Sequence, residues 1–355
     1  MNDRDSALLW LLRRSLGSKT SENIAPLSSD RWKDIYQQTA CQGILALSWR
    51  AVEQLPSASQ PPRDIKLRWA YNAEQIRLRY RRQLAVATAL ASSYADEGIR
   101  TVVLKGLALS RYYPDPECRE CGDFDCFLCG EYEQGNRIAR ALGAEVDDRG
   151  YRHSHIEYKG LTIENHRYCL TVRADRHLKR LEQVLQRMAI DDFDAAFIRN
   201  TRLILPPPMF HALFLTQHAL HHFLVEGIAL RHLCDWGLFL KHEAENLDWP
   251  LFYEACRRND MLVFANTLTA ICVEKLGIDL PDRIVRDRRF MEPVWHDTLR
   301  NDNRIYDKGL GLWAARWATL KNMYRHRWKY TTIYGRDYRK EIIRSVYGIL
   351  FEKTK

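Results

Sequence analysis

The chain has 355 residues, of which 46% are hydrophobic and 28% are charged, and its formal net charge is +9. This length predicts two or three subdomains, and the hydrophobic content is enough for real cores. No stretch approaches the roughly 20 apolar residues that a membrane-spanning helix needs. Nine cysteines without framework spacing indicate a reducing compartment, and the positive charge favours an acidic partner, whether a nucleotide, a nucleic acid or an anionic surface.

Residues 1–97 form the first predicted region, which is helical. Its opening apolar patch, Ala7–Leu12, is preceded by acidic residues and followed by Arg13 and Arg14. A signal peptide would carry its positive charge in front of the apolar stretch. The pattern therefore predicts an amphipathic first helix and a cytoplasmic protein.

Three further helices are expected in this region. Ser29 can cap a helix that runs to about Gln38, and a second run spans Cys41–Gln54. After a proline-rich loop, a long helix is expected from about Ile65 to Asp96, ending at Gly98. Its basic middle, residues 77–82, is interpreted as a solvated helix face, and a groove for a phosphate-rich substrate is the alternative.

Residues 98–205 alternate strands and helices and form the predicted core, a mixed sheet with helices. A buried strand from Ile99 leads into a turn at Gly106 and a helix that opens at Leu107. Beyond the acidic strand described next, we expect the following elements: a helix over Glu131–Leu142, a hairpin of Tyr151–Tyr158 and Leu161–His166 about Lys159-Gly160, one or two helices over Asp175–Arg199, and a short strand over Leu203–Leu205.

Two short strands carry acidic residues. In a strand, positions i and i+2 face the same side, so Asp123 and Asp125 project together while Phe124 faces the other way. By the same alternation Glu164 and His166 share a face of the hairpin strand. Two adjacent carboxylates and a third from a neighbouring strand can hold two Mg²⁺ ions about 4 Å apart, as in-line phosphoryl transfer requires.

The turn before these strands is a candidate phosphate site. A glycine turn that opens a helix leaves free backbone N–H groups, which favour an anion. Gly106 provides such a turn, and Lys105, Ser110 and Arg119 lie within reach of an anion placed there.

These residues carry a family resemblance. Leu104-Lys105-Gly106, Tyr113-Pro114, Arg119, Asp123-Phe124-Asp125 and Glu164-Asn165-His166 together resemble the bacterial uncharacterised nucleotidyltransferase family of the DNA polymerase beta-like superfamily. The likeness covers roughly residues 95–205, with a looser echo over residues 231–236. Lys105-Gly106 stands where the wider superfamily usually has a Gly-Ser pair.

The resemblance implies an α+β fold with a nucleotidyltransferase-type mixed sheet, flanked by all-helical regions. It implies an enzyme that binds a nucleoside triphosphate such as ATP and Mg²⁺ or Mn²⁺, and that moves the nucleoside monophosphate to an acceptor hydroxyl with release of pyrophosphate. Asp123, Asp125 and Glu164 would hold the metal ions, with Glu164 also a candidate base. The triphosphate would be bound by Lys105, Gly106, Ser110 and Arg119, and His166 would orient Glu164 or contact the acceptor.

Residues 206–355 return to helix. After Pro206–Pro208, helices are expected over Phe210–Val225, Ala229–His242, Trp249–Arg257 and Leu262–Leu276. The first two carry a set of histidines with one aspartate: His211, His218, His221, His222, His232 and Asp235. The first reading is that these residues tie helices together and line the cleft, and the alternative is a metal site, which lacks the adjacent His-Asp pair of metal-dependent phosphohydrolases.

Two other functions remain open from the sequence. A non-catalytic protein with the same fold could hold a nucleotide, RNA or a protein partner, although three crowded carboxylates are costly without metal ions. A toxin-like enzyme that modifies tRNA ends is also compatible with the net charge. The acceptor, whether a small molecule, a peptide or protein, or RNA, is not identified by the sequence.

Overall fold

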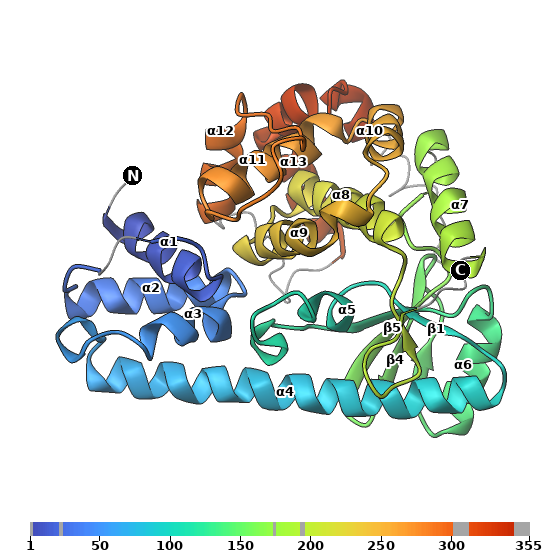
Figure 1. Ribbon diagram of the computed structural model, residues 1–355. Coiled ribbons are helices and arrows are strands. Elements are labelled where there is room, and N and C mark those ends of the chain that lie inside the picture. Colours follow the sequence, from blue (N-terminus) through green and yellow to red (C-terminus); the bar gives the residue numbers. More distant parts are fainter. Residues whose placement is uncertain (1–2, 21–23, 173–174, 192–195, 301–311, 344–355) are drawn as a thin grey trace.

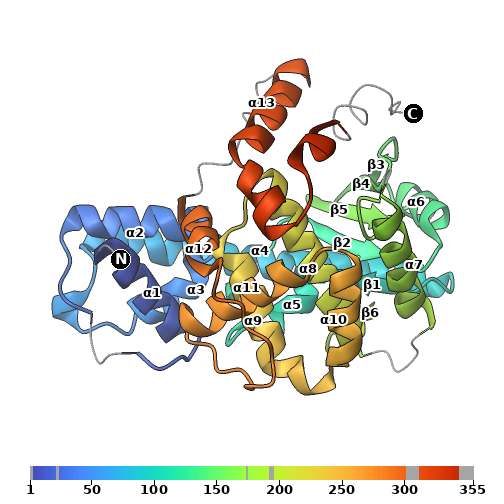
Figure 2. The same cartoon turned by 90° about the horizontal axis from the view of Figure 1, so that it is seen from above.

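The computed structural model describes residues 3–20, 24–172, 175–191, 196–300 and 312–343. A single mixed sheet lies between helices that precede it and helices that follow it in the chain (Figures 1 and 2). The predicted α+β class is therefore confirmed. Among the described helices, none combines the length and the apolar composition that crossing a bilayer requires.

The N-terminal helices agree with the sequence pattern. They are α1 (Asp3–Ser15), α2 (Ser29–Cys41), α3 (Leu45–Val52) and α4 (Arg63–Asp96), with a 3-10 turn η1 (Ser57–Ser59). The side chain of Ser28, rather than Ser29, caps α2 by accepting the Arg31 N–H at 3.3 Å. Helix α4 ends at Gly98 because the chain turns there with φ +75°, a conformation that glycine adopts without strain.

Helix α4 is about 51 Å long and connects two hydrophobic cores. Ile65 and Trp69 near its start pack in the larger core with α2 and α3, and the Trp69 indole N–H donates to the Leu45 carbonyl at 3.0 Å. From Tyr80 to Tyr94 its buried residues belong to the second core, beneath the sheet. Figure 1 shows α4 passing under both the N-terminal helices and the strands.

The sheet has six strands in the order β3-β4-β5-β2-β1-β6. The strands are β1 (Thr101–Val103), β2 (Phe124–Phe127), β3 (Glu145–Asp147), β4 (His153–Tyr158), β5 (Leu161–His166) and β6 (Leu203–Ile204), and the intervening helices are α5 (Leu107–Ser110), η2 (Pro116–Cys118), α6 (Tyr132–Ala141) and α7 (Arg176–Asp191). The pairs β2–β5 and β1–β6 are parallel, and the others are antiparallel. The predicted β4–β5 hairpin forms with Tyr158 opposite Leu161.

The two faces of the sheet differ sharply. Phe124, Cys126 and Ile163 are buried in the second core with residues of α4 and α6. The opposite face carries Asp125 and Glu164, which are partners in the β2–β5 register. The predicted alternation of Asp125 with Phe124 and Cys126 is thus confirmed, whereas Asp123, which was expected on the same strand, lies in the loop before β2.

The C-terminal helices close over the polar side of the sheet. They are α8 (Pro208–Val225), α9 (Leu230–Glu243), the 3-10 turn η3 (Ala244–Asn246), α10 (Trp249–Arg258), α11 (Leu262–Glu274), α12 (Met291–Arg300), α13 (Leu312–Arg325) and the π-helix η4 (Lys329–Ile333). They also contact the N-terminal helices, because Gln42 accepts the Leu230 N–H at 2.7 Å and donates to the Thr298 carbonyl at 2.8 Å.

A buried polar network fixes β5 against α6. Asn136 is fully buried on α6, and its side-chain oxygen accepts hydrogen bonds from Ser154 at 2.7 Å and Asn165 at 2.9 Å. Asn165 lies between Glu164 and His166 in the chain and faces the other way. The network therefore holds the strand that presents both of those side chains.

Replacing Asn136 by alanine should remove the shared acceptor and leave the Ser154 hydroxyl and the Asn165 amide buried without it. We expect the free energy of unfolding to fall by about 1–3 kcal/mol in urea titrations. Arg137→Ala is the control, because the exposed Arg137 bonds Gln134 at the surface and should change stability by less than about 0.5 kcal/mol. Equal stability of the two variants would show that the network does not hold β5.

Candidate active site

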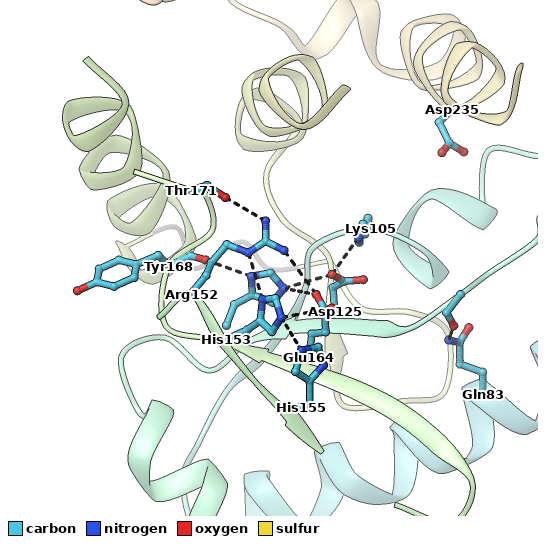
Figure 3. Close-up of polar contacts among 12 residues, drawn as sticks. Gln83, Lys105, Asp125, Arg152, His153, His155, Glu164, Tyr168, Thr171 and Asp235 are labelled. Carbon is cyan, nitrogen blue, oxygen red and sulfur yellow. Dashed lines mark hydrogen bonds and ion pairs between the residues drawn. The ribbon is translucent and has the colours of Figure 1, made fainter. Parts of the chain in front are cut away.

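Three neighbouring strands place one row of ionisable side chains on the same face of the sheet. His155 on β4 is opposite Glu164 on β5, and Glu164 is opposite Asp125 on β2. His153 and His166 form the next row. Figure 3 shows Asp125, Glu164, His153 and His155 converging above the strands, with Lys105 approaching Asp125 from the side.

Asp125 is buried and has cationic neighbours. It is 2% exposed, and its Oδ1 lies 3.1 Å from the Lys105 ammonium and 3.2 Å from His166 Nε2. Burial alone would raise the pKa of Asp125, but Lys105 and then His166 outweigh it and lower that pKa. The other oxygen, Oδ2, is buried and has no hydrogen-bond partner among the described residues.

His166 bridges the two carboxylates. Its Nε2 lies 3.3 Å from Glu164 Oε2 as well as close to Asp125, and its Nδ1 lies 3.1 Å from the Tyr168 carbonyl. Burial would lower the pKa of His166, but its bonds to Asp125 and Glu164 raise it. The raised pKa favours the protonated imidazole, whose two N–H groups would then face a carbonyl on one side and the two carboxylates on the other.

Asp123 completes the acidic set from the loop before β2. The residue is exposed overall, but partial burial of its carboxylate and then the charges of Glu164 and Asp125 raise its pKa. Gln83 of α4 holds this loop by donating to the Gly122 carbonyl at 2.7 Å. The three carboxylates thus lie near enough to repel one another, and a bound cation would relieve that repulsion.

A cavity of about 430 Å³ lies between this sheet edge and helices α8 and α9. Of the residues predicted for the site, the ones that line it are Lys105, Gly106, Arg119, Asp123 and Asp125. Gly106 has φ +59°, so a glycine is needed for the turn that brings Lys105 to Asp125. A volume of this size is ordinary for a small-molecule site.

Ser110 and Arg119 have partners other than the predicted anion. Ser110 is 1% exposed, lies outside the cavity lining, and bonds the Leu107 carbonyl at 2.7 Å and Tyr80 Oη at 2.9 Å. Arg119 makes a bidentate pair with Asp235 of α9, at 2.9 and 2.8 Å, and Tyr113 donates to the same carboxylate at 2.8 Å. Arg119 therefore connects the loop before β2 to helix α9.

The helical histidines separate into two groups. His218, His222 and His232 line the cavity, whereas His221 is exposed and does not. Burial lowers the pKa values of His218 and His232 well below the usual value, so both are neutral near pH 7. Asp235 is engaged by Arg119. Among the described residues, the sets of three donor atoms within 4.8 Å of one another are Asp125-Glu164-His166 and His153-His155-Glu164.

The hairpin also brings Arg152 and His153 to the site, and neither was among the predicted residues. Arg152 Nη2 lies 3.7 Å from Glu164, and His153 Nε2 lies 3.4 Å from it. The signal was available, because the hairpin was expected about Lys159-Gly160. Pairing Tyr158 with Leu161 and counting outward along both strands sets His155 opposite Glu164.

Breaking the buried Arg119–Asp235 ion pair should lower the stability of the protein. Asp235→Ala leaves the Arg119 guanidinium, 6% exposed, without its counter-charge, and should lower the free energy of unfolding by about 3–5 kcal/mol. Glu254→Ala breaks the exposed pair with Arg258 and should cost less than about 1 kcal/mol. Arg119→Met combined with Asp235→Leu should recover much of the loss, and urea unfolding of all three variants tests this. A single-variant loss no larger than that of Glu254→Ala would contradict it.

A second prediction concerns acid sensitivity. Burial, followed by the charge of Arg111, lowers the pKa of His211 to about 3, whereas the unfolded value is about 6.5. The folded state then binds fewer protons between these values, so stability falls as pH drops from 6.5 towards 3. By pH 5 the loss from this residue is about 2 kcal/mol.

His211→Asn keeps a donor for the Leu104 carbonyl and removes the titrating ring. The difference between the free energies of unfolding at pH 7 and pH 5 should therefore be smaller than in wild type by about 2 kcal/mol. His296→Asn, at an exposed position, is the control and should leave the difference unchanged. An unchanged difference in His211→Asn would mean that acid unfolding is controlled by other groups.

The whole-chain comparisons agree with the motifs. No curated protein and no solved structure matches this chain. Residues 28–277 match a protein family described as "Uncharacterised nucleotidyltransferase", which is the family that the motifs between residues 104 and 166 resemble. This match covers the N-terminal helices from α2, the whole sheet and helices α8 to α11. The chain belongs to the uncharacterised nucleotidyltransferase family.

Proposed function

We propose that this protein transfers a nucleoside monophosphate from a nucleoside triphosphate to an acceptor hydroxyl and releases pyrophosphate. Its family supports nucleotidyl transfer in general terms. The observation that carries the finer proposal is Asp125, which lies at the wall of the cavity with Oδ1 next to Lys105 and with Oδ2 buried without a partner among the described residues. Buried acceptors without partners are uncommon, and a cation would satisfy this one.

The carboxylates fit Mg²⁺ or Mn²⁺. Both ions prefer oxygen ligands, and Asp123, Asp125 and Glu164 would supply them. Burial raises the pKa of Asp123 most, and the charges of Glu164 and Asp125 raise it further, so the three carboxylates repel one another and a cation would be favoured among them. When bound, such ions would neutralise phosphate charge and stabilise the attacking and leaving oxygens.

The cations at the cavity would bind the triphosphate. Lys105 is 27% exposed in its side chain and could exchange its contact with Asp125 for a phosphate oxygen. Arg231 of α9 lines the same cavity and was not among the predicted residues. Arg119 is already neutralised by Asp235, so we assign it the positioning of α9 rather than a phosphate contact.

The remaining groups would orient the acceptor side. The acceptor oxygen would form a bond to the α-phosphorus while the bond to the bridging oxygen breaks, and that electron pair would leave with pyrophosphate. Glu164 is the candidate to accept the hydroxyl proton, and His166, 3.3 Å from it, would hold its orientation. Neutral His218 and His232 would border the nucleoside or the acceptor. Most of the rate enhancement would come from positioning and charge neutralisation.

The contacts in the basic middle of α4 do not favour the alternative of a groove for a phosphate-rich substrate. Arg77 pairs with Asp115 at 2.9 Å, and Arg81 pairs with Glu117 at 2.6 Å. Arg82 donates to the Lys159 carbonyl at 2.8 Å. These arginines hold the segment around η2 and the β4–β5 turn against α4, which supports the interpretation of this run as structural.

The test combines labelled product with nucleotide binding. Wild type should convert at least one labelled triphosphate with Mg²⁺ to product or to labelled protein, and should bind triphosphate more tightly with Mg²⁺ than without it. Asp125→Asn should lose this gain in affinity and at least about 10²-fold of turnover. Asp148→Asn is the control, because Asp148 pairs with Arg140 at the surface and should behave as wild type.

Glu164→Gln separates chemistry from binding. It should keep triphosphate affinity within a few-fold and lower turnover by at least about 10²-fold. Equal triphosphate affinity with and without Mg²⁺ in wild type and in Asp125→Asn would rule out the metal assignment. Unchanged turnover in Glu164→Gln would move the third carboxylate elsewhere.

A further inference from the structure

A second cluster of donor atoms lies beside the carboxylates. His153 and His155 alternate on β4, and both face Glu164 of the neighbouring strand β5. The two Nε2 atoms are 3.2 Å apart, and His153 Nε2 is 3.4 Å from Glu164 Oε1. All three donor atoms lie within 4.8 Å of one another. Figure 3 shows the three side chains converging on one point above the strands.

The spacing is that of ligands around a tetrahedral ion. A zinc ion held about 2.0–2.1 Å from its donors sets neighbouring donor atoms about 3.3 Å apart. The two separations measured here, 3.2 and 3.4 Å, lie on either side of that value. The imidazole rings are perpendicular, with centroids 4.6 Å apart, so the two nitrogens approach without stacking of the rings. These two separations therefore match those around a zinc ion, and the third, between His155 and Glu164, is within 4.8 Å.

We propose that His153, His155 and Glu164 form a site for a divalent transition-metal ion of the zinc class. Two imidazole nitrogens and one carboxylate oxygen suit such an ion, whereas Mg²⁺ prefers oxygen ligands only. His155 is exposed, so the ion could enter from solvent and keep a fourth position for water. This site differs from the one assigned to Asp123, Asp125 and Glu164, although Glu164 belongs to both.

Arg152 opposes the ion and gives the proposal a sharp consequence. Its Nε donates to His153 Nδ1 at 3.1 Å, and its Nη2 lies 3.7 Å from Glu164 Oε2. Coordination through Nε2 requires the proton on Nδ1, so this hydrogen bond must be given up. Arg152 also bonds Thr171 at 3.4 Å and is 23% exposed, which leaves it room to turn away. Removing its charge should therefore tighten binding of the ion.

The two sites share Glu164. Its Oε1 faces His153, while Oε2 faces His166 and the Asp125 side. An ion held by His153 and His155 would fix this carboxylate on the β4 side. A bound transition-metal ion would then inhibit turnover. This inhibition rests on the proposed function, whereas binding of the ion to the site does not.

The test measures binding without any activity. The full chain is stripped with chelator and titrated with Zn²⁺ by calorimetry, and with Co²⁺ by the visible absorption of the tetrahedral ion. One equivalent should bind to wild type, and His155→Ala should weaken it by more than the roughly 10–100-fold that loss of a residue behind a ligand costs. Arg152→Gln should bind several-fold more tightly than wild type.

Three controls locate the ion. His222→Ala removes a cavity histidine whose ring lies 4.5 Å from that of His218, and His296→Ala removes an exposed histidine beside Glu292. Asp125→Asn alters the other donor set. All three variants should still bind one equivalent of the ion, as wild type does. Undiminished binding in His155→Ala, weaker binding in Arg152→Gln, or loss of binding in His222→Ala or Asp125→Asn would overturn the proposal.

Discussion

The parallel pairing of β2 with β5 sets Asp125 directly opposite Glu164, and most of the site follows from this placement. Like charges on facing positions of adjacent strands destabilise a sheet, and burial of Asp125 makes the repulsion stronger. The chain compensates with His166 between the two carboxylates and Lys105 at the edge. Without these contacts, this register would place two uncompensated carboxylates side by side.

The cavity depends on a second interaction, the ion pair between Arg119 and Asp235. It connects the long segment between α5 and β2 to α9, and Tyr113 adds a hydrogen bond to the same carboxylate. Two further charged groups link α9 to the same part of the chain, because Arg111 pairs with Glu243 at 2.9 Å and Arg231 donates to the Glu120 carbonyl at 3.2 Å. Gln42 adds a neutral link from the N-terminal helices to α9. The N-terminal helices, the sheet edge and the C-terminal helices are therefore linked to one another around the cavity.

Period-two and helical patterns predicted most elements of this fold. The strand alternation around Asp125 and the hairpin about Lys159-Gly160 were available from residue types alone, as was the end of α4 at Gly98. The edge strand β3 was not, because its three residues, Glu145–Asp147, are not buried and include a single apolar side chain, Val146. Ion pairs between residues far apart in the sequence could not be predicted from local patterns either. Nothing local indicated that Arg119 would meet Asp235, 116 residues away, so it was assigned to a phosphate instead.

Several of the arginines in this basic chain have structural partners. Arginines of α4 are paired with acidic residues of the segment around η2, and Arg13 donates to the carbonyl groups at the end of α11. Three cations line the cavity among the described residues. Arg119 is neutralised by its bidentate pair with Asp235, whereas Lys105 and Arg231 have no such bidentate pair. Even Lys105 is shared with Asp125. Recognition of a polyphosphate would then depend on a few charges at one turn and one helix, placed beside carboxylates that repel an anion unless metal ions accompany it.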